Sequence, residues 1–280
     1  MPKTQNKVKY GLKNAHYALL TIADDGTVSF GKPVPIPGSV SLTMDAQGDT
    51  ENFYADNMAY YVTTANDGYS GTFEVALIPD QFRQDVLHET LDANAQMLTE
   101  NISNQTSPFA LLFEFEGDVR AIRHVFYNCT CTRPGVSGST TTNTKTPTTE
   151  TMSLTASPLP NGNTKSRTTA NTPAAQYAGF YDAVWQPLGE LVVESEAGTT
   201  AGDTILTVAP AAASGNSYKY QTGASVQLPA YGETLNGGWT DWDGSEEITA
   251  TSGQQIAVVE VNASNQAIAG GVTTVVSNGG

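Results

Sequence analysis

The sequence has few of the residues from which catalytic and metal sites are built. Its 280 residues include two cysteines and three histidines, and the histidines are widely separated at His16, His88 and His124. Cys129 and Cys131 are two positions apart, a spacing that suits burial on one face of a strand better than a strain-free disulfide or a metal site. Motifs for phosphate-binding loops, nucleophile elbows or paired catalytic carboxylates are missing. The sequence therefore predicts a protein that is not an enzyme and uses no cofactor or metal ion.

Long hydrophobic segments are also missing. The first residues, Met1–Lys7, lack the apolar core of a signal peptide, and no apolar run is long enough to cross a bilayer. We therefore expect no membrane insertion and a protein made in a cytoplasm. Hydrophobic residues make up 39% of the chain and glycine is abundant, a balance that favours a loop-rich, mainly β fold over a helical one.

Basic residues are scarce, and their distribution is uneven. The net charge is −15 and the sequence pI is about 4.4, which argues against a protein that grips nucleic-acid phosphates. Residues 1–187 contain 12 basic and 18 acidic side chains, whereas residues 188–280 contain one basic side chain, Lys219, and ten acidic ones. This asymmetry predicts two domains, 1–187 and 188–280, and favours either a distinct surface task for the second domain or simple solubility.

Alternation of apolar and polar residues predicts strands along most of the first domain. The clearest hairpin joins Phe109–Phe115 to Ile122–Phe126 through a turn at Glu116-Gly117-Asp118. Upstream, Ala59–Thr64 and Gly71–Ile78 also alternate, so we expect them to form a second pair of strands.

Helices are expected in two places only. Asp80 is predicted to cap an amphipathic helix that runs to about Leu91, and Tyr177–Trp185 is predicted to form a short terminal helix. The second domain is predicted to be a small sandwich or barrel. Its expected strands are Ile205–Val208, Ser217–Tyr220, Ala224–Leu228, Glu247–Thr251, Gln255–Val261 and Ala267–Val272.

The order of segments in the first domain resembles that of the major tail tube proteins of long-tailed bacteriophages, particularly those of Gram-positive hosts. The resemblance covers roughly residues 8–187. The segments that carry it are Phe53–Asn57, Gly71–Phe82, Ala110–Asp118, Ala121–Pro134 and Thr149–Pro158. It implies a mainly β fold, with a tail-tube-type β-sandwich or barrel flanked by an α-helix and followed by a small immunoglobulin-like or related β domain.

The same resemblance implies a structural function. It predicts that the chain self-assembles into hexameric rings that stack as a tail tube, the conduit for genome delivery, and that it is located in the virion tail after assembly in the bacterial cytoplasm. The implied partners are further copies of the chain, a tape-measure protein, a tail terminator, tail-tip proteins and viral DNA in transit. Exposed strand edges template pairing with other chains, so Phe53, Tyr54, Asp56 and Asn57 are predicted assembly contacts.

The second domain offers an alternative function. Its segment Gly237–Gly244 resembles small β domains appended to phage tail proteins, which project outward and bind cell-surface carbohydrate weakly. Trp239 and Trp242, beside Asp241 and Asp243, have the chemistry of a glycan site, an aromatic platform with polar acceptors. Packing of these tryptophans in a small core is the favoured explanation, because aromatic side chains dominate cores. The alternative prediction is therefore a carbohydrate-binding or adhesion protein that acts through this domain.

Overall fold

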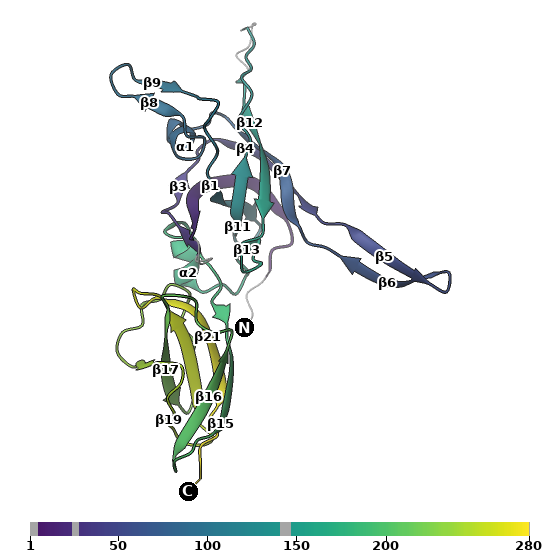
Figure 1. The fold of residues 1–280 in the computed structure, drawn as a ribbon. Coiled ribbons are helices and arrows are strands. Elements are labelled where there is room, and N and C mark those ends of the chain that lie inside the picture. Colours follow the sequence, from purple (N-terminus) through teal and green to yellow (C-terminus); the bar gives the residue numbers. More distant parts are fainter. Residues whose placement is uncertain (1–4, 24–27, 141–146, 280) are drawn as a thin grey trace. The chain divides into compact units, whose positions relative to one another are not determined.

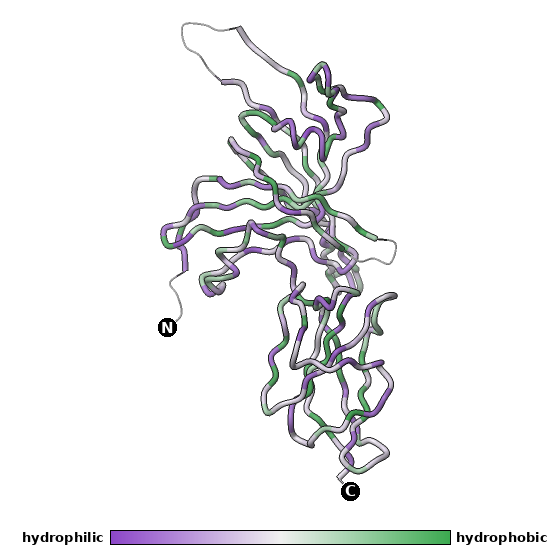
Figure 2. The backbone as a smooth tube through the Cα atoms, turned by 90° about the vertical axis from the view of Figure 1, so that its left-hand side faces the viewer, coloured by the Kyte–Doolittle hydropathy of each residue, from purple (hydrophilic) through white to green (hydrophobic). Residues whose placement is uncertain are grey.

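The computed structural model describes residues 5–23, 28–140 and 147–279, and the chain is mainly β (Figure 1). It forms two compact units, Met1–Val184 and Trp185–Gly280. Hydrophobic stretches lie along the paired strands of each unit, separated by polar turns (Figure 2). Among the described residues, none of the helices has the length and apolar character that crossing a membrane requires.

The N-terminal unit is built on a nine-stranded sheet with the order β2-β1-β10-β11-β12-β7-β4, to which β13 and β3 add on β11 and β1. Its pairs are antiparallel. Two further hairpins, β5–β6 and β8–β9, lie outside this sheet. The strands are β1 (Lys9–Ile22), β2 (Val28–Phe30), β3 (Val34–Pro35), β4 (Ser39–Gln47), β5 (Thr50–Ala55), β6 (Met58–Thr64), β7 (Gly68–Val75), β8 (Thr90–Asp92), β9 (Met97–Thr99), β10 (Phe109–Gly117), β11 (Ile122–Cys131), β12 (Glu150–Ser157) and β13 (Lys165–Arg167).

The centre of this sheet is buried on both faces. Strand β10 alternates between them, because successive side chains of a strand point in opposite directions. Phe109, Leu111 and Phe113 belong to a core that includes helix α1 (Asp80–Asp85), whereas Ala110 and Leu112 pack on the opposite side in a cluster with residues of helix η1 (Gly179–Tyr181). A short helix α2 (Ala174–Ala178) precedes η1.

The C-terminal unit is a two-sheet sandwich. A five-stranded sheet has the order β14-β21-β20-β17-β18, and a three-stranded sheet has the order β15-β16-β19. Val193 and Leu206 from the smaller sheet join Ile256 and Val258 from the larger one in a shared core. The strands are β14 (Gly189–Glu190), β15 (Val192–Ala197), β16 (Asp203–Ala209), β17 (Ser217–Gly223), β18 (Thr240–Trp242), β19 (Ile248–Thr249), β20 (Gln255–Val261) and β21 (Ala267–Thr274).

Several predicted elements differ from the structure. Helix α1 ends at Asp85 and begins after Pro79 with no side-chain cap, so Asp80 is its first residue and not its N-cap. A positive φ of 57° at His88 takes the backbone out of helical geometry before Leu91. The predicted helix over Tyr177–Trp185 begins and ends earlier, as α2 and η1, and Ala224–Leu228 is not a strand.

Candidate assembly surface and a buried polar cluster

A two-stranded hairpin extends from the edge of the N-terminal sheet (Figure 1). Strands β4 and β7 pair as far as Gln47 opposite Gly68. Beyond this pair the ladder continues into the hairpin through hydrogen bonds from Asp67 N to Gln47 O (3.0 Å) and from Ala65 N to Asp49 O (2.9 Å). We call residues 48–67, which comprise β5, β6 and their connections, the arm.

The arm is exposed on both of its faces. Every residue of β6 is exposed, as are all residues of β5 except Ala55. Tyr60 and Tyr61 are adjacent in a strand and therefore point to opposite faces, yet their exposed fractions are 71% and 63%. The exposed large hydrophobic side chains of the arm are Phe53, Tyr54, Met58, Tyr60, Tyr61 and Val62. Scattered single apolar side chains are common on protein surfaces, but six on one short hairpin are typical of a site of protein–protein or membrane interaction.

Two of the predicted contact residues form the tip of the arm. Asp56 and Asn57 have positive φ angles of 51° and 60°, and they lie between Ala55 and Met58, which pair directly. This is the geometry of a two-residue type I′ turn, which asparagine and aspartate tolerate better than other non-glycine residues. Their backbone therefore closes the hairpin, and Phe53 and Tyr54 present side chains along it.

The strand pairing predicted from the sequence is wrong in this region. Ala59–Thr64 was expected to pair with Gly71–Ile78, but β6 pairs with β5 and β7 pairs with β4 and β12. Met58, Tyr60 and Tyr61 therefore join the same exposed surface as Phe53 and Tyr54. The one indication in the sequence was the presence of aromatic residues at both parities of a single strand, a pattern that a half-buried strand does not show.

Gly48 makes the entry to the arm possible. Its φ is 137°, and a Cβ atom at this position would lie 2.1 Å from the carbonyl oxygen of Ala65. That carbonyl belongs to the opposite side of the hairpin, so a side chain at Gly48 and the ladder cannot coexist. The glycine therefore allows the two strands of the arm to stay paired as they leave the sheet.

Replacing Gly48 with alanine is expected to open the base of the arm while the core of the N-terminal unit stays folded. The backbone strain alone costs about 1–3 kcal/mol, and the clash with Ala65 adds to it. Limited proteolysis with chymotrypsin, which cleaves after aromatic residues, should cut the arm of the variant faster than that of the parent. Gly135→Ala is the matched control, because a Cβ there has nothing within 4 Å. Equal cleavage rates in all three proteins would contradict the role of Gly48 in keeping the two strands of the arm paired.

The predicted glycan residues of the C-terminal unit have structural roles. Trp242 is 7% exposed, and its indole Nε1 donates a hydrogen bond to the carbonyl of Glu246 at 2.8 Å. Trp239 packs partly buried against a separate small cluster. Asp241 forms an ion pair with Lys219. Trp242 is thus a core residue and Trp239 is partly buried, an arrangement that agrees with the packing explanation. A glycan contact at these residues stays a prediction.

Asp243 supports the turn that follows Trp242. Its carboxylate accepts hydrogen bonds from the backbone N–H groups of Ser245 (2.8 Å) and Glu246 (2.9 Å). These backbone donors, that of Glu246 first, hold the pKa of Asp243 below its ordinary value. The aspartate therefore stabilises a local turn.

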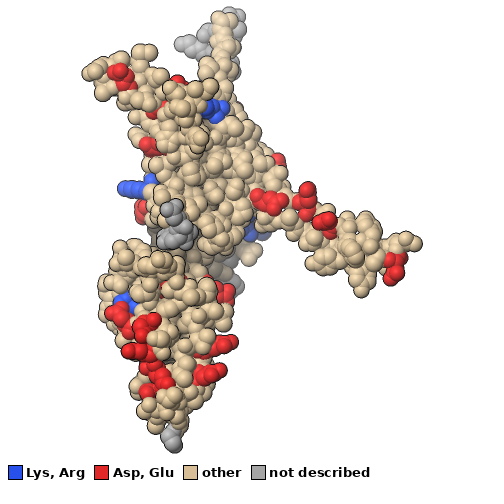
Figure 3. Space-filling view, viewed as in Figure 1, with Lys and Arg blue, Asp and Glu red and all other residues tan. Residues whose placement is uncertain are grey.

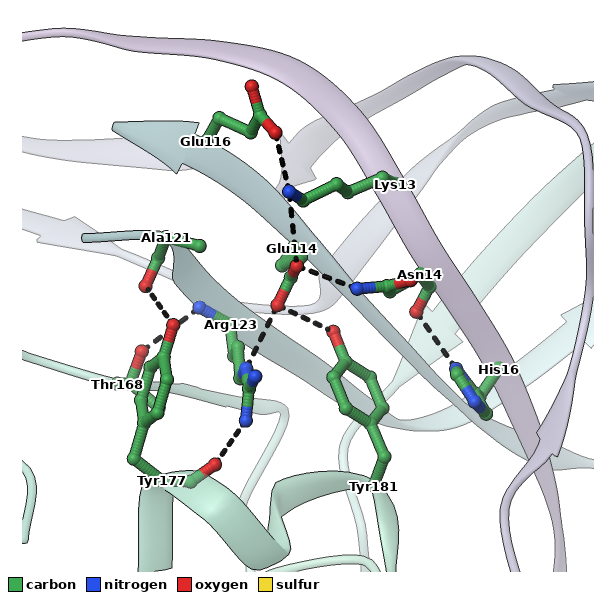
Figure 4. Close-up of polar contacts among 10 residues, drawn as sticks. All are labelled: Lys13, Asn14, His16, Glu114, Glu116, Ala121, Arg123, Thr168, Tyr177 and Tyr181. Carbon is green, nitrogen blue, oxygen red and sulfur yellow. Dashed lines mark hydrogen bonds and ion pairs between the residues drawn. The ribbon is translucent and has the colours of Figure 1, made fainter. Parts of the chain in front are cut away.

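A cluster of hydrogen-bonded polar side chains lies on the β1–β10–β11 part of the N-terminal sheet (Figure 4). The carboxylate of Glu114 is 4% exposed and receives the guanidinium Nε of Arg123 at 2.9 Å. The amide of Asn14 donates to it at 2.7 Å, and the hydroxyl of Tyr181 donates at 3.3 Å. Asn14 reaches it from a bulge in β1, where its φ is 54°. The ammonium Nζ of Lys13 lies 3.9 Å from Oε1 of the same carboxylate.

Arg123 connects this cluster to helix α2. Its guanidinium lies 3.8 Å from the ring centre of Tyr177 and donates to that residue's carbonyl oxygen. The hydroxyl of Tyr177 in turn donates to Ala121 O at 3.1 Å (Figure 4). Burial raises the pKa of the Tyr181 phenol, so it remains a hydrogen-bond donor at neutral pH. The Glu114 carboxylate is therefore fully engaged in docking α2 and η1 onto the sheet, and its oxygens are not free for acid–base chemistry.

The cysteines and histidines do not assemble into a site either. Cys129 and Cys131 are free thiols, and burial raises the pKa of each to about 12. Within residues 5–23, 28–140 and 147–279, three or more potential metal-binding side chains come together nowhere. The arm is therefore the principal candidate functional surface of this mainly β chain.

One family model and one solved structure of a surface-layer protein are similar to this chain. The family model that matches is the C-terminal domain of the S-layer protein SbsC, and its match covers residues 196–278. Among solved structures, a crystal structure of domains 7, 8 and 9 of SbsC is similar at 12% identity and a TM-score of 0.30, covering 96% of this chain and 72% of that chain. No curated protein sequence matches the chain.

These findings overturn the resemblance to phage tail tube proteins. The matched family model describes an S-layer protein, so the prediction of a tail tube subunit is wrong. The expectations that depended on it are also wrong, namely hexameric rings in a virion tail, tape-measure, terminator and tail-tip partners, and the transit of viral DNA. The alternative of a carbohydrate-binding or adhesion protein gains no support from the same comparisons.

Proposed function

We propose that this chain is a self-associating structural subunit of a protein layer at a cell surface, and that the arm carries contacts between its copies. The observation that carries the proposal is the exposure of six large hydrophobic side chains on both faces of the arm. Soluble monomeric domains rarely present a surface of this kind. In an assembly the same side chains are buried, and the hydrophobic effect then stabilises the contact.

The C-terminal unit supports the surface-layer part of the proposal. Residues 196–278 are similar to the C-terminal domain of an S-layer protein. Acidic side chains form several groups on the face of this unit seen in Figure 3, in line with the ten acidic residues and one basic residue of positions 188–280. A surface of strong single-sign charge keeps a protein soluble and discourages non-specific contacts, so the acidic unit suits the outward or spacing part of a layer.

We propose that this function involves no catalysis. Among the described carboxylates of the N-terminal unit, that of Glu114 is the most buried, and its oxygens are occupied by Arg123, Asn14 and Tyr181. The thiols of Cys129 and Cys131 are buried and protonated at neutral pH. These groups therefore contribute to the fold, and the functional residues are those of the exposed arm.

Excision of the arm tests the proposal. Replacing residues 48–67 with Asn-Gly leaves Gln47 and Gly68, which already pair directly, joined by a two-residue turn of the preferred type. Sedimentation velocity over a range of concentrations should show oligomers or sheets for the parent chain and a monomer for the excised variant. Circular dichroism should show that the remaining sheet is intact.

A milder variant separates the loss of side chains from the loss of the hairpin. Exchanging Tyr54, Tyr60 and Tyr61 for threonine keeps strand propensity while removing apolar area, and it should weaken association to a similar extent. The matched control is Tyr10→Thr, an exposed tyrosine outside the arm. A parent chain that stays monomeric at high concentration, or an excised variant that assembles as the parent does, would overturn the proposal.

A further inference from the structure

A second surface of the N-terminal unit carries basic side chains that have no acidic partner. Lys9, Lys165 and Arg167 are exposed, and within the part of the chain that the structure describes none of them forms an ion pair. In contrast, Lys13, Arg83, Arg123 and Arg133 each pair with a glutamate. Other described cations, such as Lys32, also form no ion pair, so the distinguishing feature of these three is that they gather on one surface of a protein whose net charge is −15.

These cations lie together over an aromatic floor. Lys9 Nζ is 4.8 Å from the ring centre of Phe115, and Lys165 Nζ is 4.2 Å from that of Tyr69. Arg167 on β13 pairs in register with His124 on β11. The ring centres of Phe115 and His124 are 5.6 Å apart, and Lys165 pairs in register with Phe126, two residues from His124 on the same strand. The three cations therefore lie around the same imidazole. We call Lys9, Lys165 and Arg167, with this floor, the basic surface.

The arm has the complementary composition. Residues 48–67 contain the acidic residues Asp49, Glu51, Asp56 and Asp67 and no lysine or arginine. None of these carboxylates forms an ion pair with a described residue. In the view of Figure 3 the arm shows acidic side chains and no basic ones. Its exposed tyrosines also offer ring faces, which attract lysine and arginine side chains.

We propose that the arm of one copy of this chain packs against the basic surface of a second copy. The inference rests on the proposed function and adds to it the surface that receives the arm. Unpaired carboxylates and aromatic rings on the arm meet unpaired cations and an aromatic floor, so both electrostatic and apolar complementarity favour the contact. Each copy carries one arm and one basic surface, and such a head-to-tail contact generates a closed ring or an extended array.

Charge exchange tests the contact. The double variant Lys165→Glu/Arg167→Glu reverses the basic surface, and Asp49→Lys/Glu51→Lys reverses the charge near the base of the arm. Each alone should weaken self-association by about 100-fold, because like charges then face each other. Mixing the two variants should restore association between them, and a chain that carries all four substitutions should associate with itself. Sedimentation velocity measures each case, and added salt should weaken the parent's association.

The controls separate this inference from the proposed function. Lys32→Glu makes the same charge change as a single Lys165→Glu variant at an exposed lysine outside the basic surface, and it should leave association unchanged. If arm excision abolishes association while both charge-reversed variants still associate as the parent does, the receiving surface is wrong and the proposed function stands. If neither excision nor charge reversal alters association, both are overturned. Weakening without restoration in the mixture would show that the two surfaces do not contact each other, and would also overturn this inference.

Discussion

Exchange of Arg123 for methionine is expected to lower the free energy of unfolding of the N-terminal unit by about 3–5 kcal/mol. The substitution leaves the Glu114 carboxylate, 4% exposed, without the guanidinium that lies 2.9 Å from it. A buried charge that loses its partner is among the most destabilising changes a fold can suffer. The arginine's stacking on Tyr177 is lost at the same time.

The tryptophan distribution makes this measurement specific. Trp185, Trp239 and Trp242 are the chain's three tryptophans, and all lie in the C-terminal unit. In a urea titration, far-UV circular dichroism follows both units, whereas tryptophan fluorescence follows the C-terminal unit. The Arg123 variant should therefore shift the dichroism transition and leave the fluorescence transition in place.

Two companion variants decide whether the charge pair is responsible. Lys13→Met removes a more exposed partner of the same carboxylate, 3.9 Å away, and should have little effect because solvent screens such a pair. The double variant Glu114→Met/Arg123→Met removes both charges and should recover much of the lost stability. An Arg123→Met protein as stable as the parent would contradict the structural role assigned to this cluster.

The stability of the N-terminal unit is expected to fall by on the order of 3 kcal/mol as the pH is lowered from about 6.5 to about 4 on account of His124 alone. Burial and the nearby Arg167, Lys9 and Lys165 lower the pKa of His124 from 6.5 to about 4. In this window the unfolded chain binds a proton that the folded chain does not, so acid favours unfolding. Above pH 6.5 both states are neutral at this residue and the contribution vanishes.

A substitution at His124 isolates this effect from the carboxylates that titrate in the same range. The imidazole stacks on Phe113 with ring centres 5.2 Å apart, so His124→Phe keeps an aromatic ring at the site. The free energy of unfolding, measured in urea at intervals from pH 4 to 7, should depend less on pH in this variant than in the parent. His88→Asn retains His124 and should keep the parent's slope. Identical slopes in the parent and His124→Phe would contradict the prediction.

The fold was predicted best where neighbouring residues determine the pairing. The β10–β11 hairpin was expected from the alternation of Phe109–Phe115 and Ile122–Phe126, and the two strands do pair, with Phe115 opposite Ile122. A short connection leaves the two strands little choice of partner. The length of helix α1 was wrong because the sequence pattern continues past Asp85 whereas the backbone turns at His88.

Pairing and function were harder to predict where distant residues decide them. The strand at residues 58–64 has two adjacent neighbours along the chain, and its alternation does not distinguish them. Glu114 and Asn14 meet across 100 residues, a contact that no local pattern encodes. The tail tube prediction failed for a related reason, since an ordered set of strands and turns describes many mainly β folds and does not specify what they assemble into.

The burial of both thiols has a practical consequence for the arm. Cys129 and Cys131 are the chain's only cysteines and are 0% and 7% exposed. Maleimide reagents react with exposed thiolates, so we expect them not to label the parent protein. A cysteine introduced at Asn57, in the turn that closes β5–β6, would then be the single thiol that such reagents can label. Dyes, gold particles or cargo proteins attached there would sit at one defined point of every subunit.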